Sequence, residues 1–219
     1  MSTQGICRII WVVSLIGIFG SLIAFGTRTS NASKPASFTS YATSDKLIKV
    51  VYPENWTHTS TSSHDVKTTA LFEADDNTRL VVVADLQGSL LADMSKSNSA
   101  LIQELSSKLG SKVPADAKKS PLETMHEFNQ SAISRKFTSY AEEPAKRQMI
   151  GKLEAMASEF SAKEASIFSK GKLVGKRFTV LGNDKMFTIY WVCLEKNSND
   201  LIPVFNKMLD SLSLGEGSN

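Results

Sequence analysis

Paired cysteines are what this 219-residue sequence most plainly lacks. It has only two cysteines, Cys7 before the apolar run 9–26 and Cys193 far beyond it in an apolar, strand-like stretch. We expect the run to keep the two thiols apart, so that no disulfide forms within the chain. A hydrophobic core must then hold the following domain together. Cys7 precedes the run, so the sequence has no lipoprotein-type cysteine directly after it.

Motifs that carry chemistry are also missing. The sequence contains no G-x-S-x-G, no P-loop and no context that would activate a cysteine. The stretch Asp75-Asp76-Asn77 lacks the glycine and the glutamate that a calcium loop requires, so it is read as a turn. We therefore expect no catalytic residue, no metal and no cofactor.

An excess of positive charge is missing from most of the chain. The formal net charge is +3, but Arg8 and Arg28 flank the apolar run and no acidic residue precedes Asp45. The remainder carries 23 basic and 22 acidic groups. No basic stripe with interleaved aromatic residues occurs, which excludes nucleic acid as the expected partner.

The uncharged run from Ile9 to Gly26 is the strongest signal present. As a helix it would span roughly 27 Å at about 1.5 Å per residue, close to the thickness of a bilayer core. Signal peptides usually have apolar cores of about 7–15 residues. We predict a single-pass anchor at 9–26, a cytoplasmic tail at 1–8 and an extracytoplasmic (periplasmic) C-terminal part. Ser30-Asn31-Ala32 resembles a cleavage site, so secretion after cleavage behind Ala32 stays an alternative.

The residues after the run are expected to form a linker and one domain. Residues 27–44 are rich in Ser, Thr and Ala and are predicted to be the linker, with the domain at 45–214 and a tail at 215–219. Strands are predicted early and late in this domain, with a polar loop at 58–67, Trp56 folded back onto the core and a closing helix from Asp200 to Leu212. The predicted strands are 47–52, 69–74, 79–86, 165–170, 172–181 and 185–194.

The middle of the domain is predicted to be a helical insertion, at about 120–162. A first helix with a stripe at 101–109 precedes it. Ser120-Pro121 opens the next helix, predicted to run through Tyr140, and Pro144 opens another. This last helix would carry an apolar stripe of Met149, Leu153, Met156 and Phe160. A stripe that contains methionine is a possible interaction face, although such a face usually packs on a sheet.

Strands, then helices, then strands predict an α+β domain with an antiparallel sheet covered by helices. The stretches VVYPENW, FEADDNTRLVVVADL and VFNKMLDSLSL make 45–100 and 165–214 resemble the PsbP-like superfamily, which includes bacterial DcrB-like proteins. The matching positions are Pro53, Trp56, Phe205, Leu209, Ser211 and Leu212. The resemblance implies an α/β/α sandwich and mostly non-catalytic roles in assembly or in the cell envelope. The long helical middle departs from that pattern.

Three functional hypotheses follow. The first is a membrane-tethered, extracytoplasmic, non-catalytic interaction domain that binds a protein or envelope component. The second is a module that binds a small molecule or lipid. The third is a metal-dependent envelope enzyme using the loop with His58 and His64, because histidines with a carboxylate are typical metal ligands.

Overall fold

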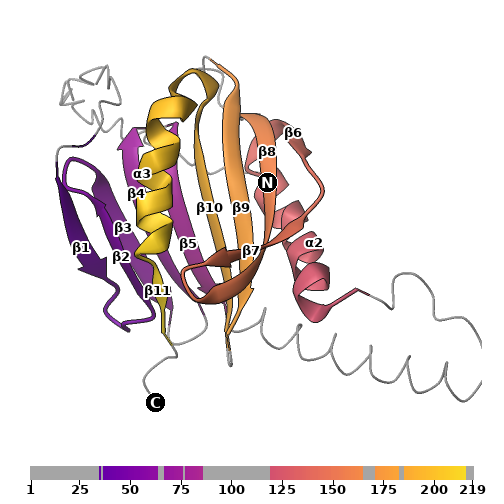
Figure 1. Cartoon of the computed structure of the whole chain (residues 1–219), viewed down its shortest axis with the longest axis horizontal. Coiled ribbons are helices and arrows are strands. Elements are labelled where there is room, and N and C mark those ends of the chain that lie inside the picture. The colour runs from indigo at the N-terminus through magenta and orange to yellow at the C-terminus, as the bar shows by residue number, and fades with distance from the viewer. Residues whose placement is uncertain are drawn as a thin grey trace, which may run out of the picture.

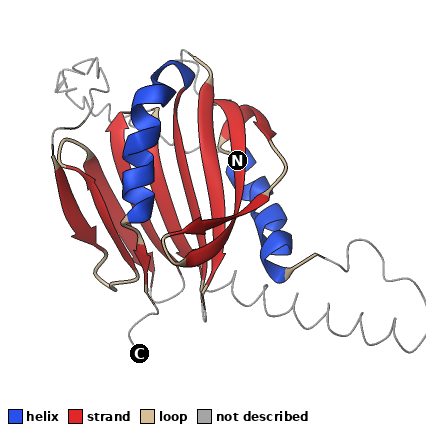
Figure 2. Ribbon diagram, viewed as in Figure 1, coloured by secondary structure: helices blue, strands red, loops and turns tan. Residues whose placement is uncertain are grey.

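The computed structural model describes residues 35, 37–63, 67–75, 77–85, 119–164, 171–182 and 185–215 (Figure 1, Figure 2). The strands in these ranges are β1 (Phe38–Ala42), β2 (Ile48–Pro53), β3 (Thr57–Ser63), β4 (Lys67–Asp75), β5 (Thr78–Asp85), β6 (Phe137–Glu142), β7 (Lys146–Ile150), β8 (Leu153–Glu164), β9 (Leu173–Leu181), β10 (Met186–Leu194) and β11 (Ser213–Leu214). The helices are α2 (Pro121–Ser134), a one-turn 3₁₀ helix η2 (Glu195–Asn197) and α3 (Ser198–Asp210).

The strands form two antiparallel sheets. The large sheet has the order β3-β4-β5-β10-β9-β8-β6, with β7 also paired to β8, and the small sheet has the order β1-β2-β11. Every strand pair within the described ranges is antiparallel. The described chain is therefore mostly sheet with two α-helices, and the predicted α+β class with an antiparallel sheet is confirmed.

One face of the large sheet is covered by α3 and the small sheet (Figure 1). Leu201, Phe205 and Met208 of α3 are buried in this interface. The Phe205 ring stacks on Trp191 at 4.8 Å between centroids and meets the edge of Trp56 at 5.7 Å. Trp56 is only 5 % exposed, which confirms that it folds back onto the core.

The opposite face of the large sheet carries α2. Side chains alternate along β9, so that Arg177 and Thr179 reach α2 while Phe178 and Val180 pack toward α3. The predicted start of α2 is confirmed. Ser120 Oγ accepts a hydrogen bond from the Glu123 N–H, and the Glu123 carboxylate accepts one from the Ser120 N–H, which is a complete capping box.

The prediction that this helix continues to Tyr140 is wrong. The helix ends at Ser134, and residues Phe137–Glu142 form β6. The rings of Phe137 and Tyr140 lie 5.7 and 5.1 Å from the Phe160 ring, so they pack on β8 instead of extending a helical stripe. Strand pairing with β8 thus overrides the helical spacing of these residues.

The prediction of a helix from Pro144 to Phe160 is also wrong, and the middle of the domain is not a helical insertion. Residues Lys146–Ile150 and Leu153–Glu164 form the hairpin β7–β8, which turns at Gly151 with φ +56°. Strand β8 is buried on both faces over residues 155–158, because one face packs into the core on the α3 side and the other lies under α2. Apolar residues spaced by three or four then arise in a strand as readily as in a helix.

Two polar segments also differ from the prediction. Phe38–Ala42, which lies in the predicted linker, forms β1, and residues 58–63 of the predicted loop 58–67 belong to β3. The remaining predicted strands agree with β2, β4, β5, β9 and β10, and α3 agrees with the closing helix. The apolar run 9–26, the stripe 101–109 and the predicted strand 165–170 lie outside the described residues. Among the helices that are described, none is long and apolar enough to cross a bilayer.

Candidate functional site

A groove opens on the face of the large sheet that carries α3. One wall is the side of α3 formed by Ser198, Ile202 and Asn206, which recur every fourth residue. The other wall is the chain from 141 to 148, between β6 and β7, and the floor is formed by β8 and β9. We call this feature the α3 groove. Its volume is about 720 Å³, within the range of sites that accept a small ligand or a peptide segment.

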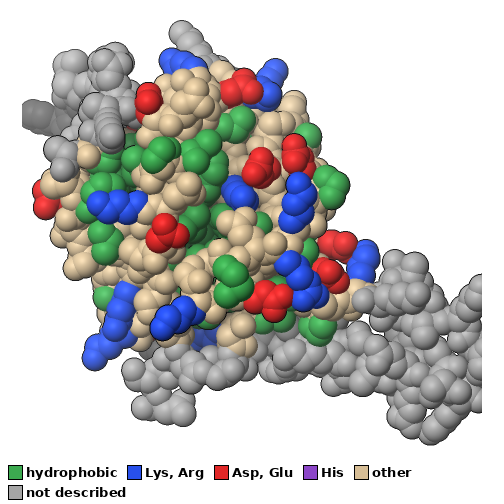
Figure 3. Space-filling model, in the orientation of Figure 1, with side chains coloured by type: hydrophobic (Ala, Val, Ile, Leu, Met, Phe, Trp, Pro, Cys, Tyr) green, Lys and Arg blue, Asp and Glu red, His purple; other side chains and the backbone are tan. Residues whose placement is uncertain are grey.

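The α3 groove combines charged, amide and apolar side chains. Lys176 and Glu159 face each other across its floor at 3.5 Å, and Glu159 is 65 % exposed. At one rim Lys172 pairs with Glu195 at 2.7 Å. Apolar side chains gather along the middle of this face, with charged groups around them (Figure 3). The groove therefore offers both signs of charge and an apolar surface to an occupant.

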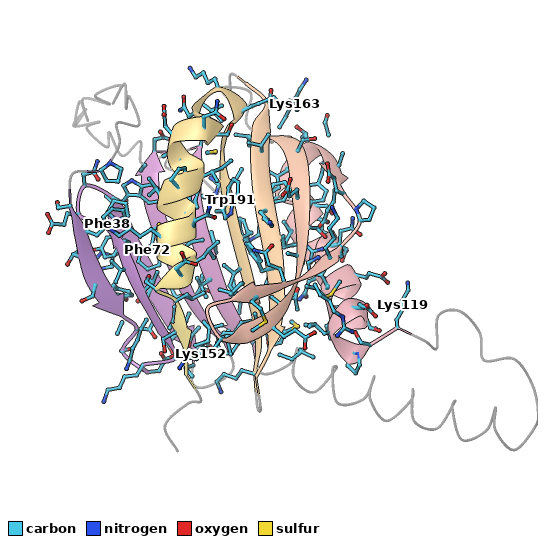
Figure 4. All side chains as sticks on the ribbon, viewed as in Figure 1. Phe38, Phe72, Lys119, Lys152, Lys163 and Trp191 are labelled. Atoms are coloured by element: carbon cyan, nitrogen blue, oxygen red, sulfur yellow. The ribbon has the colours of Figure 1, made fainter. Side chains whose placement is uncertain are left out.

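Trp191 lies beside α3 over the middle of the sheet and lines the groove (Figure 4). Its side chain is 6 % exposed, and its indole N–H is buried without an acceptor among the described residues. A buried donor that lacks a partner destabilises a protein by about 1–3 kcal/mol. An acceptor brought to this position by an occupant would remove that penalty.

A buried charged cluster lies beneath α2, on the other side of the sheet. Arg177 of β9 donates from Nε to Glu142 Oε1 at 2.9 Å, and its Nη2 lies 2.7 Å from the same oxygen. The Tyr140 hydroxyl donates to Glu142 Oε2 at 2.9 Å. Burial, followed by the charge of Glu142, raises the pKa of Tyr140, so this phenol keeps its proton.

The same arginine fixes the position of α2. Arg177 Nη1 donates to the backbone carbonyl of His126 at 2.7 Å. The His126 ring places Nδ1 2.9 Å from Thr179 Oγ1 and Nε2 2.8 Å from Ser158 Oγ. The cluster thus ties one helix to three strands, because Glu142 lies on β6, Ser158 on β8 and Thr179 on β9.

The surroundings of His126 determine its protonation. Burial, and then the nearby Arg177 charge, lowers the pKa of His126 from its usual 6.5 to about 3. Arg177 Nη1 lies 3.3 Å from Nδ1, so Nδ1 must carry a lone pair and Nε2 the proton that is donated to Ser158. Glu142 Oε1 lies 3.8 Å from Nε2, too far for a hydrogen bond. We therefore assign a neutral imidazole.

Ser158 and His126 do not form a hydrolytic pair. A catalytic triad needs a carboxylate on the second ring nitrogen, whereas here that nitrogen faces a guanidinium and a threonine hydroxyl. Ser158 is 3 % exposed and lies under α2, out of reach of a substrate. The arrangement holds α2 in place and does not activate a nucleophile.

The four residues predicted as an interaction face do not share a surface. Met149 lies on β7 and is 56 % exposed, whereas Leu153 packs against the core on the α3 side. Met156 and Phe160 are buried in β8, and Phe160 belongs to the cluster beneath α2. Only Phe160 lines the α3 groove. As a helical face the prediction fails, because the segment is a hairpin.

Of the two histidines proposed as metal ligands, the structure describes only His58. His58 lies on β3, where its Nδ1 is 2.9 Å from the Tyr52 hydroxyl and its ring is 4.4 Å from Tyr41. His64 lies outside the described residues. Within the part of the chain that is described, no group of three His, Cys, Asp or Glu side chains is placed to hold a metal ion. Burial raises the pKa of the Cys193 thiol to about 12, so it stays protonated.

Sequence reasoning missed the α3 groove. One signal was present, because Ser198, Ile202 and Asn206 occur at helical spacing on the flank of α3 beside its buried stripe. Two further lining residues, Lys176 in strand β9 and Lys172 directly before that strand, lie earlier in the chain. Nothing in the sequence, however, shows that 141–148 lies across the sheet from α3.

Comparisons with known proteins show likeness at the level of structure. No family model matches the sequence, and no curated protein matches it. Cyanobacterial PsbP from Synechocystis sp. superposes with a TM-score of 0.48 at 11% identity, over 85% of this chain and 98% of that one. LpqN of Mycobacterium tuberculosis, described as involved in cell envelope biogenesis, has a TM-score of 0.42 at 11% identity, over 82% and 91%.

The Ran-binding protein Mog1p of Saccharomyces cerevisiae has a TM-score of 0.45 at 9% identity, over 81% of this chain and 95% of that one. All three TM-scores lie below 0.5, and the identities are 9% to 11%. Identity this low says nothing about what the chain binds, so function is argued from the site alone.

Proposed function

We propose that this protein is a non-catalytic, extracytoplasmic interaction domain that holds a segment of a protein partner in the α3 groove. The observation that carries the proposal is the groove itself, which opens beside α3 with charges of both signs, amide groups and an exposed aliphatic side chain, Ile202. Such a mixed, half-apolar surface is typical of protein–protein contacts that form and dissociate.

The walls of the groove are firmly supported, which favours binding to a preformed site. Glu142 ends β6 at the point where the chain enters one wall, and its carboxylate is held by Arg177. The other wall belongs to α3, which is anchored by Phe205 between two tryptophans. A surface that is ordered before binding loses little conformational entropy when a partner docks.

The tether is part of the proposal. The run 9–26 has the length and the lack of charge of a membrane span, and residues 27–37 would connect it to β1. On this view the domain works close to the outer surface of the cytoplasmic membrane. Its partner is then a membrane protein or an envelope component within reach of that tether.

The unpaired indole of Trp191 favours a second candidate, a small molecule or lipid with a hydrogen-bond acceptor. Such a ligand would occupy the same groove and reach the Trp191 N–H after a small movement of the side chains above it. Thermal unfolding with a panel of lipids and metabolites distinguishes the two candidates. A saturable rise of the midpoint with a pure compound would favour the small ligand.

The protein-partner proposal is tested with two matched surface variants of the full-length chain. Ile202→Arg changes the groove, whereas Phe128→Arg changes another exposed apolar side chain, on α2. Proteins retained from a membrane extract of the native cell are identified for each variant. We expect a partner that binds the wild type and Phe128→Arg but not Ile202→Arg. Equal retention by both variants would overturn the proposal.

A further inference from the structure

The two ends of the large sheet are built differently. At the β6–β7 end the pairing with β8 is interrupted by a bulge between Thr138 and Ala141, and Pro144 separates the two strands. Lys146 and Arg147 add exposed charges there. Bulges, prolines and charges are the devices that keep an edge strand from pairing with another chain. This end is therefore protected.

The β3 end has none of these devices. Its sequence, THTSTSS, contains no lysine, arginine, acidic residue or proline, and all seven side chains are exposed. The register with β4 runs without interruption from Thr57 opposite Glu73 to Ser63 opposite Lys67. Within the described ranges no strand pairs with the outer side of β3. Among the described residues, an uncharged edge of seven residues without a bulge is therefore unpaired.

Contacts on one face hold β3 in place and leave this edge accessible. The Tyr41 hydroxyl of β1 donates to Ser60 Oγ at 2.6 Å, and the Tyr41 ring packs against His58. Ser62 Oγ donates to Asp45 Oδ2 at 3.3 Å. The side chains of Thr57, Thr59 and Thr61 alternate with these and point to the other face. The strand is therefore fixed before any partner arrives.

We propose that β3 pairs antiparallel with β3 of a second copy of this chain, about a twofold axis at Ser60. A strand of seven residues overlaps itself completely only when its central residue lies on the axis. Ser60 then faces Ser60 of the partner, and Thr59 faces Thr61. The outer pairs are His58 with Ser62 and Thr57 with Ser63. No pair brings like charges together, and all pairs except those with His58 join the short hydroxyl side chains of threonine and serine, which form favourable cross-strand pairs.

A second copy fits this edge better than an unrelated peptide does. Domains that capture a foreign strand at a sheet edge read it through pockets for alternate side chains. The exposed hydroxyls of β3 form no apolar pocket, whereas they are complementary to themselves, as a twofold interface requires. The axis runs perpendicular to the sheet, so both α3 grooves face the same side, at the far ends of the joined sheet. This inference does not depend on the proposed function.

Charge placement tests both the dimer and its register. The full-length chain is studied in detergent by light scattering and sedimentation over a range of concentrations. We expect a dimer for the wild type. Thr59→Lys/Thr61→Lys places lysine opposite lysine twice and should leave a monomer. Thr59→Glu/Thr61→Lys places opposite charges in the same positions and should restore the dimer.

A cysteine variant supplies a second readout that needs no added charge. Residues facing each other in an antiparallel pair have Cα atoms about 4.5–5.5 Å apart, within reach of a disulfide. In a Cys7→Ser background, Ser60→Cys should form a disulfide-linked dimer under mild oxidation, and Gln130→Cys on α2 should not. The proposal is overturned by a monomeric wild type, by equal behaviour of the two charge variants, or by equal cross-linking at both cysteines.

Discussion

Arg177 and Glu142 form a two-nitrogen ion pair, with contacts of 2.9 and 2.7 Å to one carboxylate oxygen, and their side chains are 1 % and 2 % exposed. The pair joins β9 to the end of β6, directly before the chain that forms one wall of the α3 groove. The shape of the groove therefore depends on an interaction that lies on the other face of the sheet.

Removing one member of this pair should strongly destabilise the fold. Arg177→Met leaves the Glu142 charge buried without its cation, and we expect the free energy of unfolding to fall by about 3–5 kcal/mol. Urea unfolding followed by circular dichroism measures the change. The double variant Arg177→Met/Glu142→Leu should recover most of the loss, because no charge is left unpaired. A single variant as stable as the wild type would show that the pair is not closed in solution.

The stability of the protein should fall in mild acid because of His126. Its pKa is about 3 in the folded protein and near 6.5 in the unfolded chain, so the unfolded state binds the extra proton. The stabilisation is complete above the unfolded pKa and is lost as the pH falls from there toward 3. The slope reaches about 1.4 kcal/mol per pH unit.

The measurement is urea unfolding of the wild type and of His126→Gln at several pH values. Asp45 and other carboxylates contribute to both proteins alike, so the difference between the two slopes reports the histidine. The wild type should have the steeper slope below about pH 6, near the usual pKa of histidine. Identical slopes would mean that His126 is accessible to protons in the folded state.

Gly175 should not tolerate a side chain. A Cβ at this position would lie 2.3 Å from Phe160 Cζ and 2.4 Å from the Trp191 carbonyl oxygen. Gly175→Ala should destabilise the protein by about 1–3 kcal/mol or more, because the backbone oxygen is not free to move away. Phe160→Leu in the same chain should rescue it only in part. Thermal unfolding of the wild type and of these two variants checks this, and full rescue would contradict the backbone contact.

Trp191→Phe should lower the affinity for an occupant of the α3 groove and leave the stability of the protein nearly unchanged. Phenylalanine keeps an aromatic ring on Phe205 and removes the N–H that has no acceptor among the described residues. Loss of a buried unpaired donor should offset most of the lost apolar contact, so the unfolding midpoint in the absence of an occupant should change little. If an occupant supplies an acceptor, its affinity should drop by about tenfold, which corresponds to 1.4 kcal/mol. Unchanged affinity would place the occupant away from Trp191.

The sequence predicts those elements whose signal is local. The arms of the β9–β10 hairpin are apolar and β-branched around a Gly-Asn-Asp turn, and α3 shows a regular stripe, so both were found. The start of α2 was found because its capping box lies within four residues. Met149, Leu153, Met156 and Phe160 misled the prediction, since apolar residues at helical spacing also arise in strands, here in the two arms of a hairpin.

The buried cluster and the groove were beyond sequence reasoning, because they depend on contacts between distant residues. Glu142 and Arg177 are 35 residues apart, and His126 is 51 residues from Arg177. From the sequence alone, each of these charged or polar residues would be expected on the surface. Only the register of β6, β8 and β9 brings Glu142 and Arg177 to the side of the sheet that carries α2. A shift of the register by one residue would turn these two side chains to the other face.

The central claim, that the α3 groove holds a protein partner, is tested most directly by site-specific photo-crosslinking in intact cells. A photoreactive amino acid is placed at Ile202 in the groove or at Phe128 on α2, and covalent adducts are compared after irradiation. We expect one discrete protein adduct at Ile202 that is absent at Phe128 and is lost when Asn206→Arg is added to block the groove. The same adducts at both positions, or none at Ile202, would contradict it.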